Sequence, residues 1–189
     1  AFKKGLDIHK FTAAEINNIP LDKVTSEMRF AAKALNFGII YGMGAQSFAE
    51  SANISKERAK EFISEYLKDF SGVAQYIKKL QEEARKRGYT VTLFGRRRYL
   101  PGLNSPYPMF RFQAERMAIN MPIQGLEADI VKKAMTEVNN WIQKEGHNDK
   151  IRMLLQVHDE LLFEVKKDFI KEAAPKIAEL MESVIKLKV

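Results

Sequence analysis

The sequence predicts an α+β fold in which a helical region comes first and a mixed region with two β-hairpins follows. Helix-type spacing of apolar residues continues to about residue 87. A β-rich stretch then surrounds Gly95, and two apolar runs later meet at His158 and Asp159. We therefore expect a helical part over residues 1–87 and a part with strands and helices over 88–189.

Three helices are expected in the first region, because capping residues or a glycine mark their ends. Thr25 or Ser26 can cap the first helix. Ser55 begins the second with a capping-box-like start, and Gly88 ends the third. The expected ranges are about 26–43, 55–70 and 73–87.

The second region is expected to alternate strands and helices. A hairpin around Gly95 precedes a proline-containing loop over residues 100–110. Because proline lacks an amide hydrogen, we expect the helical pattern to break at Pro122. The remaining expected elements are helices over about 112–121 and 124–144, a turn over 145–150, a tight hairpin of two buried strands over about 151–165, and a helix from Asp168 to the end.

The composition is that of a globular chain with anionic partners. Of the 189 residues, 46% are hydrophobic, the formal net charge is +7, and cysteine is absent. The positive charge favours nucleic acid, nucleotides or a membrane surface as binding partners. The alternative is a basic surface that only interacts with solvent. Disulfides and thiolate metal sites are excluded. No apolar run reaches the roughly 20 residues of a membrane helix, so we expect no membrane span. The absence of cysteine makes the cytosol the natural compartment.

A four-residue repeat marks the helix expected at 26–43. Arg29, Lys33, Phe37 and Tyr41 form one slowly winding stripe along it. Two cations suit a polyphosphate and two aromatic rings suit a base or a sugar, so the stripe fits a nucleoside triphosphate. The alternative is an amphipathic helix with two exposed cations and two core aromatic residues.

A second polar stripe is expected between residues 115 and 125. Arg116, Asn120 and Gln124 stand four residues apart among apolar neighbours. Side chains of these types hydrogen-bond base edges and sugar–phosphate groups. The alternative is a solvent-exposed face that the proline interrupts.

The join of the last two strands places carboxylates at a hairpin tip. A two-residue turn at His158 and Asp159 would hold the Asp159 carboxylate rigidly between two strands. A rigid carboxylate suits Mg²⁺, which requires near-octahedral oxygen coordination. An ordinary turn aspartate is the alternative. His158 could be a zinc ligand or a general base, but only His9 and His147 remain as further histidines, and no cysteine could complete a zinc site.

Taken together, these segments resemble the family-A DNA polymerases, the bacterial DNA polymerase I class. The stripe Arg29-x-x-x-Lys33-x-x-x-Phe37-Gly38-x-x-Tyr41-Gly42 is similar to motif B, and the run from Gln156 to Glu160 is similar to motif C. The segments 5–15, 95–103 and 114–130 also resemble family segments, in the same order. The resemblance covers nearly the whole chain. It implies helical fingers over 1–87, with the O helix at about 26–43, and then part of an antiparallel-sheet palm with flanking helices over 88–189, with the motif C hairpin at about 151–165.

The resemblance implies a DNA-directed DNA polymerase of replication or repair, which transfers nucleotidyl groups from dNTPs to a primer 3′-hydroxyl. Asp159 would bind metal with Glu160 adjacent, and Lys33 would contact the triphosphate and could protonate the leaving pyrophosphate. The implied nucleotide-binding residues are His9, Arg29, Lys33, Phe37 and Tyr41. The implied DNA-binding residues are Arg116, Asn120, Gln124, Gln156 and His158.

The implied cofactor is a pair of Mg²⁺ ions, for which Asp159 supplies one carboxylate. The other carboxylate belongs to the family's motif A, which would lie upstream of residue 1. We therefore expect primer–template DNA, dNTPs and an N-terminal polymerase segment with thumb and motif A as partners, and an inactive chain without that segment. Two positions depart from the family pattern: Phe30 stands where a second arginine is usual, and Asn17 where an aromatic residue is usual.

Two other functions compete with DNA synthesis. A single-subunit RNA polymerase shares the Arg, Lys and Tyr-Gly positions, but Phe37, Gly38 and Glu160 favour a DNA polymerase. A non-catalytic DNA-binding fragment would use only the basic helices, with Asp159 as a plain turn residue. The resemblance implies the bacterial cytoplasm or nucleoid, or a viral protein in its host, as the location.

Overall fold

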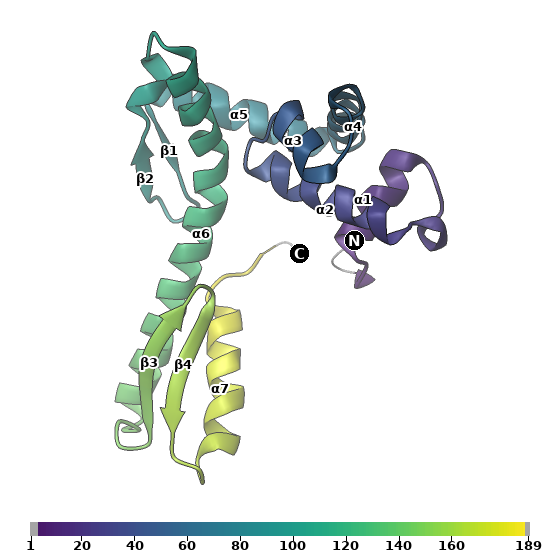
Figure 1. The fold of residues 1–189 in the computed structure, drawn as a ribbon. Helices are drawn as coiled ribbons and strands as arrows, with labels where there is room; N and C mark the ends of the chain where they lie inside the picture. The colour runs from purple at the N-terminus through teal and green to yellow at the C-terminus, as the bar shows by residue number, and fades with distance from the viewer. Residues whose placement is uncertain (1–3, 188–189) are drawn as a thin grey trace. The chain divides into compact units, whose positions relative to one another are not determined.

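The computed structural model describes residues 4–187, which are mostly helical with two small antiparallel sheets (Figure 1). This confirms the predicted α+β class. The helices are α1 (Ile8–Asn17), α2 (Ser26–Ile40), α3 (Ala45–Ala52), α4 (Lys56–Asp69), α5 (Ser71–Arg87), α6 (Pro108–Lys144) and α7 (Ile170–Ser183). The strands are β1 (Tyr89–Val91), β2 (Arg97–Tyr99), β3 (Ile151–Val157) and β4 (Glu160–Val165), and 3-10 turns lie at Leu21–Lys23 and Pro101–Asn104.

The contacts divide the chain into two compact units, and the division falls after Pro122, within α6. The strands begin at Tyr89, close to residue 87, where the sequence predicts the change from a helical part to a part with strands. The division at that point into fingers and palm is functional and stays a prediction. No helix within residues 4–187 is long and apolar enough to cross a membrane.

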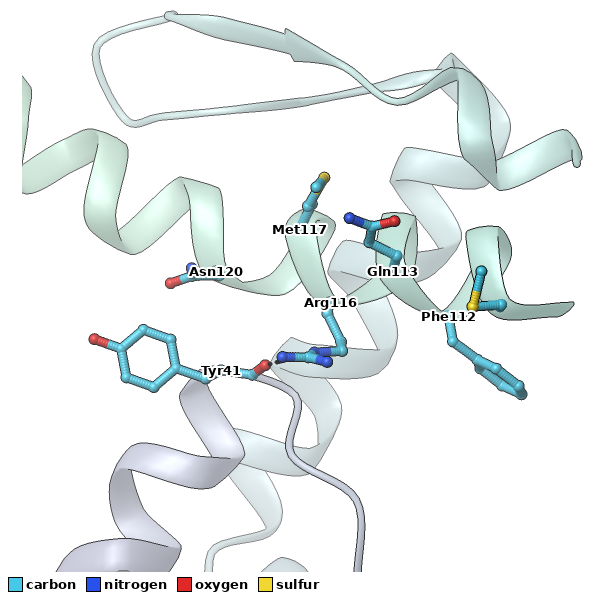
Figure 2. A pocket seen from close by; sticks show the side chains of 7 residues that line it. Tyr41, Phe112, Gln113, Arg116, Met117 and Asn120 are labelled. Carbon is cyan, nitrogen blue, oxygen red and sulfur yellow. Dashed lines mark hydrogen bonds between the residues drawn. The ribbon is translucent and has the colours of Figure 1, made fainter. Parts of the chain in front are cut away.

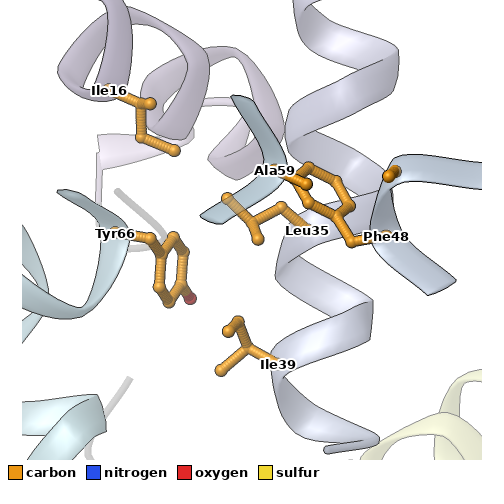
Figure 3. Close-up of a cluster of buried hydrophobic side chains, with 7 residues drawn as sticks. Ile16, Leu35, Ile39, Phe48, Ala59 and Tyr66 are labelled. Carbon is orange, nitrogen blue, oxygen red and sulfur yellow. The ribbon is translucent and has the colours of Figure 1, made fainter. Parts of the chain in front are cut away.

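In the first unit, the helices α1, α3 and α4 pack around α2 (Figures 1 and 3). Leu35 and Ile39 of α2 belong to one buried cluster with Phe48 of α3, and Ile16 and Tyr66 extend this cluster from α1 and α4. Phe48 is 1% exposed and Leu35 2% exposed, so α2 commits one face to the core. The opposite face of α2 is therefore free to carry polar and aromatic groups.

Cap residues set the helix ends much as predicted. The Thr25 hydroxyl accepts a hydrogen bond from the amide of Met28, and the Ser55 hydroxyl accepts one from the amide of Arg58. Gly88, with φ +75°, ends α5. The predicted end of α2 near residue 43 is wrong, because the helix stops at Ile40 before the left-handed Gly42.

The predicted hairpin around Gly95 is confirmed. β1 pairs antiparallel with β2, with Tyr89 opposite Tyr99, and Gly95 in the turn has φ +86°. The predicted loop that follows is shorter than expected, because a 3-10 turn covers Pro101–Asn104 and α6 begins at Pro108.

The predicted break at Pro122 is wrong, because α6 runs unbroken through it. A proline cannot donate to the carbonyl four residues before it, which here belongs to Ala118. The Thr90 hydroxyl of β1 donates to that carbonyl at 3.2 Å instead. A partner outside the helix thus makes the proline tolerable.

The second unit combines the end of α6 with β3, β4 and α7 (Figure 1). Its core brings together six buried side chains: Val138, Ile142, Ile151, Phe169, Ala173 and Ile177. The helix α7 begins at Ile170 and ends at Ser183, so the predicted helix from Asp168 to the end is too long at both ends.

The β3–β4 hairpin has the predicted two-residue turn at His158 and Asp159, with Val157 opposite Glu160. The prediction that both strands are buried is wrong. Only Ile151, at the far end of β3, is fully buried, while Leu155 and Leu162 near the turn are 55% and 57% exposed. Within residues 4–187, the core side chains of α6 and α7 cover only the end of the hairpin away from the turn.

Candidate nucleotide and metal site

The stripe on α2 is exposed along its whole length. Arg29 and Lys33 lie in solvent, and the rings of Phe37 and Tyr41 are 45% and 40% exposed. The aromatic rings are therefore not core residues, which removes the main support for a purely structural stripe. Phe30 is also exposed on α2.

The helix α1 brings His9 to this stripe. The His9 ring lies 5.6 Å from the Phe37 ring, centroid to centroid. Its Nδ1 is 3.0 Å from the Asn36 amide nitrogen, and Asn36 also hydrogen-bonds the buried Thr12 hydroxyl. The polar contact between Asn36 and Thr12 ties α1 to α2 and holds the imidazole against Phe37.

One carboxylate that the sequence analysis missed joins His9 and Arg29. Asp7 caps α1, and its Oδ1 accepts from the amides of His9 and Lys10 at 2.9 and 3.0 Å. Its Oδ2 accepts from the Arg29 Nε at 2.8 Å. The cap is visible in the sequence as an aspartate before a helix, but the ion pair spans 22 residues and leaves no local signal.

Charge and burial shift the pKa values of this group. The amide of Lys10, the Arg29 guanidinium and the amide of His9 hold the pKa of Asp7 below its usual 3.8. Burial lowers the pKa of His9 below 6.5; Asp7 opposes this shift, while the positive charges of Arg29 and Lys33 add to it. Near pH 7 the His9 imidazole is therefore mostly neutral. Within residues 4–187 no carboxylate pairs with Lys33, so its ammonium group is available to an anion.

A cavity of about 830 Å³ opens at the end of α2 (Figure 2). Its lining residues come from the α2 end and α6: Tyr41, Met109, Phe112, Gln113, Arg116, Met117 and Asn120. The Arg116 Nε donates to the Tyr41 carbonyl at 3.3 Å. Flat rings, amides and a guanidinium together suit a nucleic acid base.

The structure thus joins two of the predicted groups in one place, since Tyr41 and Arg116 line the same cavity with Asn120. Phe112 and Gln113, which the sequence analysis did not select, lie there too. Both stand in the helix that was predicted over about 112–121, and Phe112 lies four residues before Arg116, so a longer four-residue repeat would have included it. Gln124 follows one turn after Asn120 on α6 and is exposed, in the second unit.

The hairpin tip exposes Asp159 and Glu160. His158 adopts the left-handed conformation with φ +53°. Its backbone carbonyl accepts a hydrogen bond from the side-chain Nε2 of Gln156 at 3.0 Å. Neither carboxylate has an ion pair within residues 4–187, and no group of three or more His, Cys, Asp or Glu in that range could hold a metal ion. The oxygen donors at the tip suit Mg²⁺, but they do not complete its coordination.

Comparison with known proteins identifies the family. The model of "DNA polymerase family A" matches residues 1–189. DNA polymerase I of Pseudomonas aeruginosa is 42% identical over 189 residues, which are 100% of this chain and 20% of that protein. The thermostable DNA polymerase I of Thermus aquaticus is 44% identical over 188 residues, 100% of this chain and 22% of that protein. The chain thus spans about a fifth of the length of these curated relatives.

A solved structure agrees with these sequence matches. The polymerase domain of Pol1 from M. smegmatis, in complex with DNA primer–template and dNTP, has a TM-score of 0.89 and 44% identity. The match covers 98% of this chain and 32% of that one. The chain described here therefore belongs to DNA polymerase family A.

Proposed function

We propose that this chain contributes fingers and part of the palm to a template-directed DNA polymerase, which transfers nucleotidyl groups from dNTPs to a primer 3′-hydroxyl. The observation that carries the proposal is the exposed α2 stripe of Arg29, Lys33, Phe37 and Tyr41, with His9 held against it. The M. smegmatis relative, solved with primer–template and dNTP, supports it.

Each part of the stripe has a chemical task. Arg29, Lys33 and His9 contact the triphosphate, where cations and N–H donors match phosphate oxygens. Phe37 packs on the sugar, and Tyr41 lies against the nascent base pair at the mouth of the cavity. Lys33 also donates a proton to the leaving pyrophosphate, because its ammonium group has no competing carboxylate within residues 4–187.

Primer–template DNA follows the second stripe. Arg116 and Asn120 lie at the same cavity as Tyr41 and contact the template or primer backbone there. Gln124, Gln156 and His158 add further contacts to the primer–template. We propose the cytoplasm as the compartment, and the remaining polymerase segments as partners of this chain.

Family-A DNA polymerases generally use divalent metal ions. Asp159 would hold them here with Glu160 adjacent, and the second carboxylate of a two-Mg²⁺ site would come from outside these residues. The ions supply charge neutralisation at the phosphate oxygens when bound. The contribution of this chain is the exposed Asp159 carboxylate on a two-residue turn, which has no ion pair within residues 4–187.

The test is primer extension by the intact protein. Asp159→Asn should abolish extension while primer–template affinity stays within about twofold, because the affinity of DNA complexes comes mainly from phosphate contacts. Asp168→Asn, an exposed aspartate in the same unit, is the matched control. Full activity of Asp159→Asn would support a non-catalytic DNA-binding fragment, and preferred use of rNTPs would support an RNA polymerase.

A second variant tests the stripe itself. Lys33→Ala should lower kcat by about 10²–10⁴, which is the range of general acid catalysis. Lys60→Ala, an exposed lysine on α4, should have no effect. Weaker DNA binding with normal turnover would contradict this role. We also expect no extension by the 189 residues alone.

A further inference from the structure

Asp7, the cap residue of α1, makes a charged hydrogen bond to α2 close to the stripe. Its two carboxylate oxygens have different tasks. Oδ1 accepts from the amides of His9 and Lys10, and Oδ2 accepts from the Arg29 Nε at 2.8 Å. One side chain therefore fixes the start of α1 and the direction of an arginine on α2.

The contact leaves most of the guanidinium available. Arginine has five N–H donors, and within residues 4–187 only the Nε–H of Arg29 is engaged. The four N–H donors of the terminal nitrogens stay accessible, and the Arg29 side chain is 44% exposed. A long, flexible side chain is thus held at Nε, while its terminal nitrogens have no hydrogen bond within residues 4–187. Holding a binding group in one conformation reduces the ordering cost of binding.

The same carboxylate acts on His9. Because Oδ1 caps the first turn of α1, it fixes the backbone from which the imidazole extends toward Phe37, 5.6 Å away. Arg29 and His9 come from different helices, and Asp7 hydrogen-bonds both.

We propose that Asp7 is a positioning residue, which orients Arg29 and His9 for the triphosphate of an incoming nucleotide. This proposal rests on the proposed function, since it names a residue that acts through two members of the same site. The competing explanation is that the Asp7 carboxylate occupies Arg29 and so weakens the binding of phosphate to it. The two effects change nucleotide affinity in opposite directions.

Asp7→Asn separates capping from positioning. Asparagine caps a helix about as well as aspartate does, so α1 should keep its stability. With its oxygen on the amides of α1, the substituted side chain presents NH₂ toward the Arg29 Nε, and two donors cannot bond. The variant should therefore release Arg29 at an unchanged melting temperature.

The experiment is steady-state single-nucleotide incorporation by the intact protein. Asp7→Asn should raise the KM for dNTP roughly fivefold, with kcat within about twofold, a coupling typical of residues in direct contact. Asp22→Asn, an exposed aspartate on the 3-10 turn, should leave both constants unchanged. In an Arg29→Ala background, Asp7→Asn should add little to the KM.

Different outcomes contradict different claims. An unchanged KM in Asp7→Asn, or an effect that simply adds to that of Arg29→Ala, overturns the positioning role. A lower KM overturns it in favour of competition. If Arg29→Ala itself leaves the KM unchanged, the proposed nucleotide site fails and the positioning role fails with it.

Discussion

The hydroxyl of Thr90 in β1 donates to the backbone carbonyl of Ala118 in α6 at 3.2 Å. In a regular helix that carbonyl would accept from the amide of residue 122, where this chain has a proline. Thr90 is 5% exposed and Ala118 0% exposed, so water does not replace the missing donor. The hairpin therefore helps α6 to continue through Pro122.

Thr90→Val tests this relationship. Valine keeps the shape but leaves the Ala118 carbonyl without its hydroxyl donor, so the free energy of unfolding should fall by about 1–3 kcal/mol. In a Pro122→Ala background the helix supplies its own amide, and the same change should cost much less. Urea denaturation of the four proteins measures the difference.

The control is Thr136→Val, which removes a bond between a hydroxyl and the Lys132 carbonyl on the exposed part of the same helix. It should change the unfolding free energy little. Equal costs of Thr90→Val with and without Pro122 would show that the bond does not compensate for the proline.

Pro122 also shows where prediction from the sequence ends. Local signals were sufficient where the deciding atoms are close in the chain, as at Thr25 and Ser55, whose hydroxyls accept from amides three residues later. They failed where the partner is distant: Thr90 lies 28 residues before Ala118, and Asp7 lies 22 before Arg29.

The candidate site follows the same rule. Helical spacing was enough to align Arg29, Lys33, Phe37 and Tyr41, because a four-residue repeat needs only the helix. It could not bring Arg116 to the Tyr41 carbonyl, which depends on packing between α2 and α6. Helical spacing also could not predict that the β3–β4 strands are exposed, because a run of apolar residues does not show which element packs against it.

Gly42 should not tolerate a side chain. It has φ +65°, and an added Cβ would lie 2.8 Å from the Arg116 Cγ. Gly146 has a similar φ of +69° with no neighbour within 4 Å, so Gly146→Ala measures the backbone cost alone, about 1–2 kcal/mol. Gly42→Ala should be more destabilising in thermal unfolding. Equal losses would mean that Arg116 moves aside freely.

Asn17 should be replaceable by a larger apolar residue. It lines a pocket of about 390 Å³ with Leu35, Phe48 and Phe62, and its amide bonds only the Ala13 carbonyl within the described chain. Asn17→Phe should bury its ring there and raise the unfolding free energy by about 0.5–2 kcal/mol, as other cavity-filling changes do. Asn17→Ala removes the amide without filling the space, and it should not stabilise. A lower melting temperature for Asn17→Phe would mean that the pocket cannot accept a ring.

His9 should make nucleotide binding depend on pH. Burial, Arg29 and Lys33 lower the pKa of the free imidazole below 6.5, so it is mostly neutral near pH 7. A bound triphosphate brings negative charge, which raises that pKa, and binding then takes up a proton. The KM for dNTP should therefore fall as the pH decreases from about 8 to 6, and this fall should be weaker in His9→Gln. Because the nucleotide's own titration affects both proteins equally, the difference between their pH profiles isolates the imidazole, and parallel profiles would exclude His9 from the phosphate site.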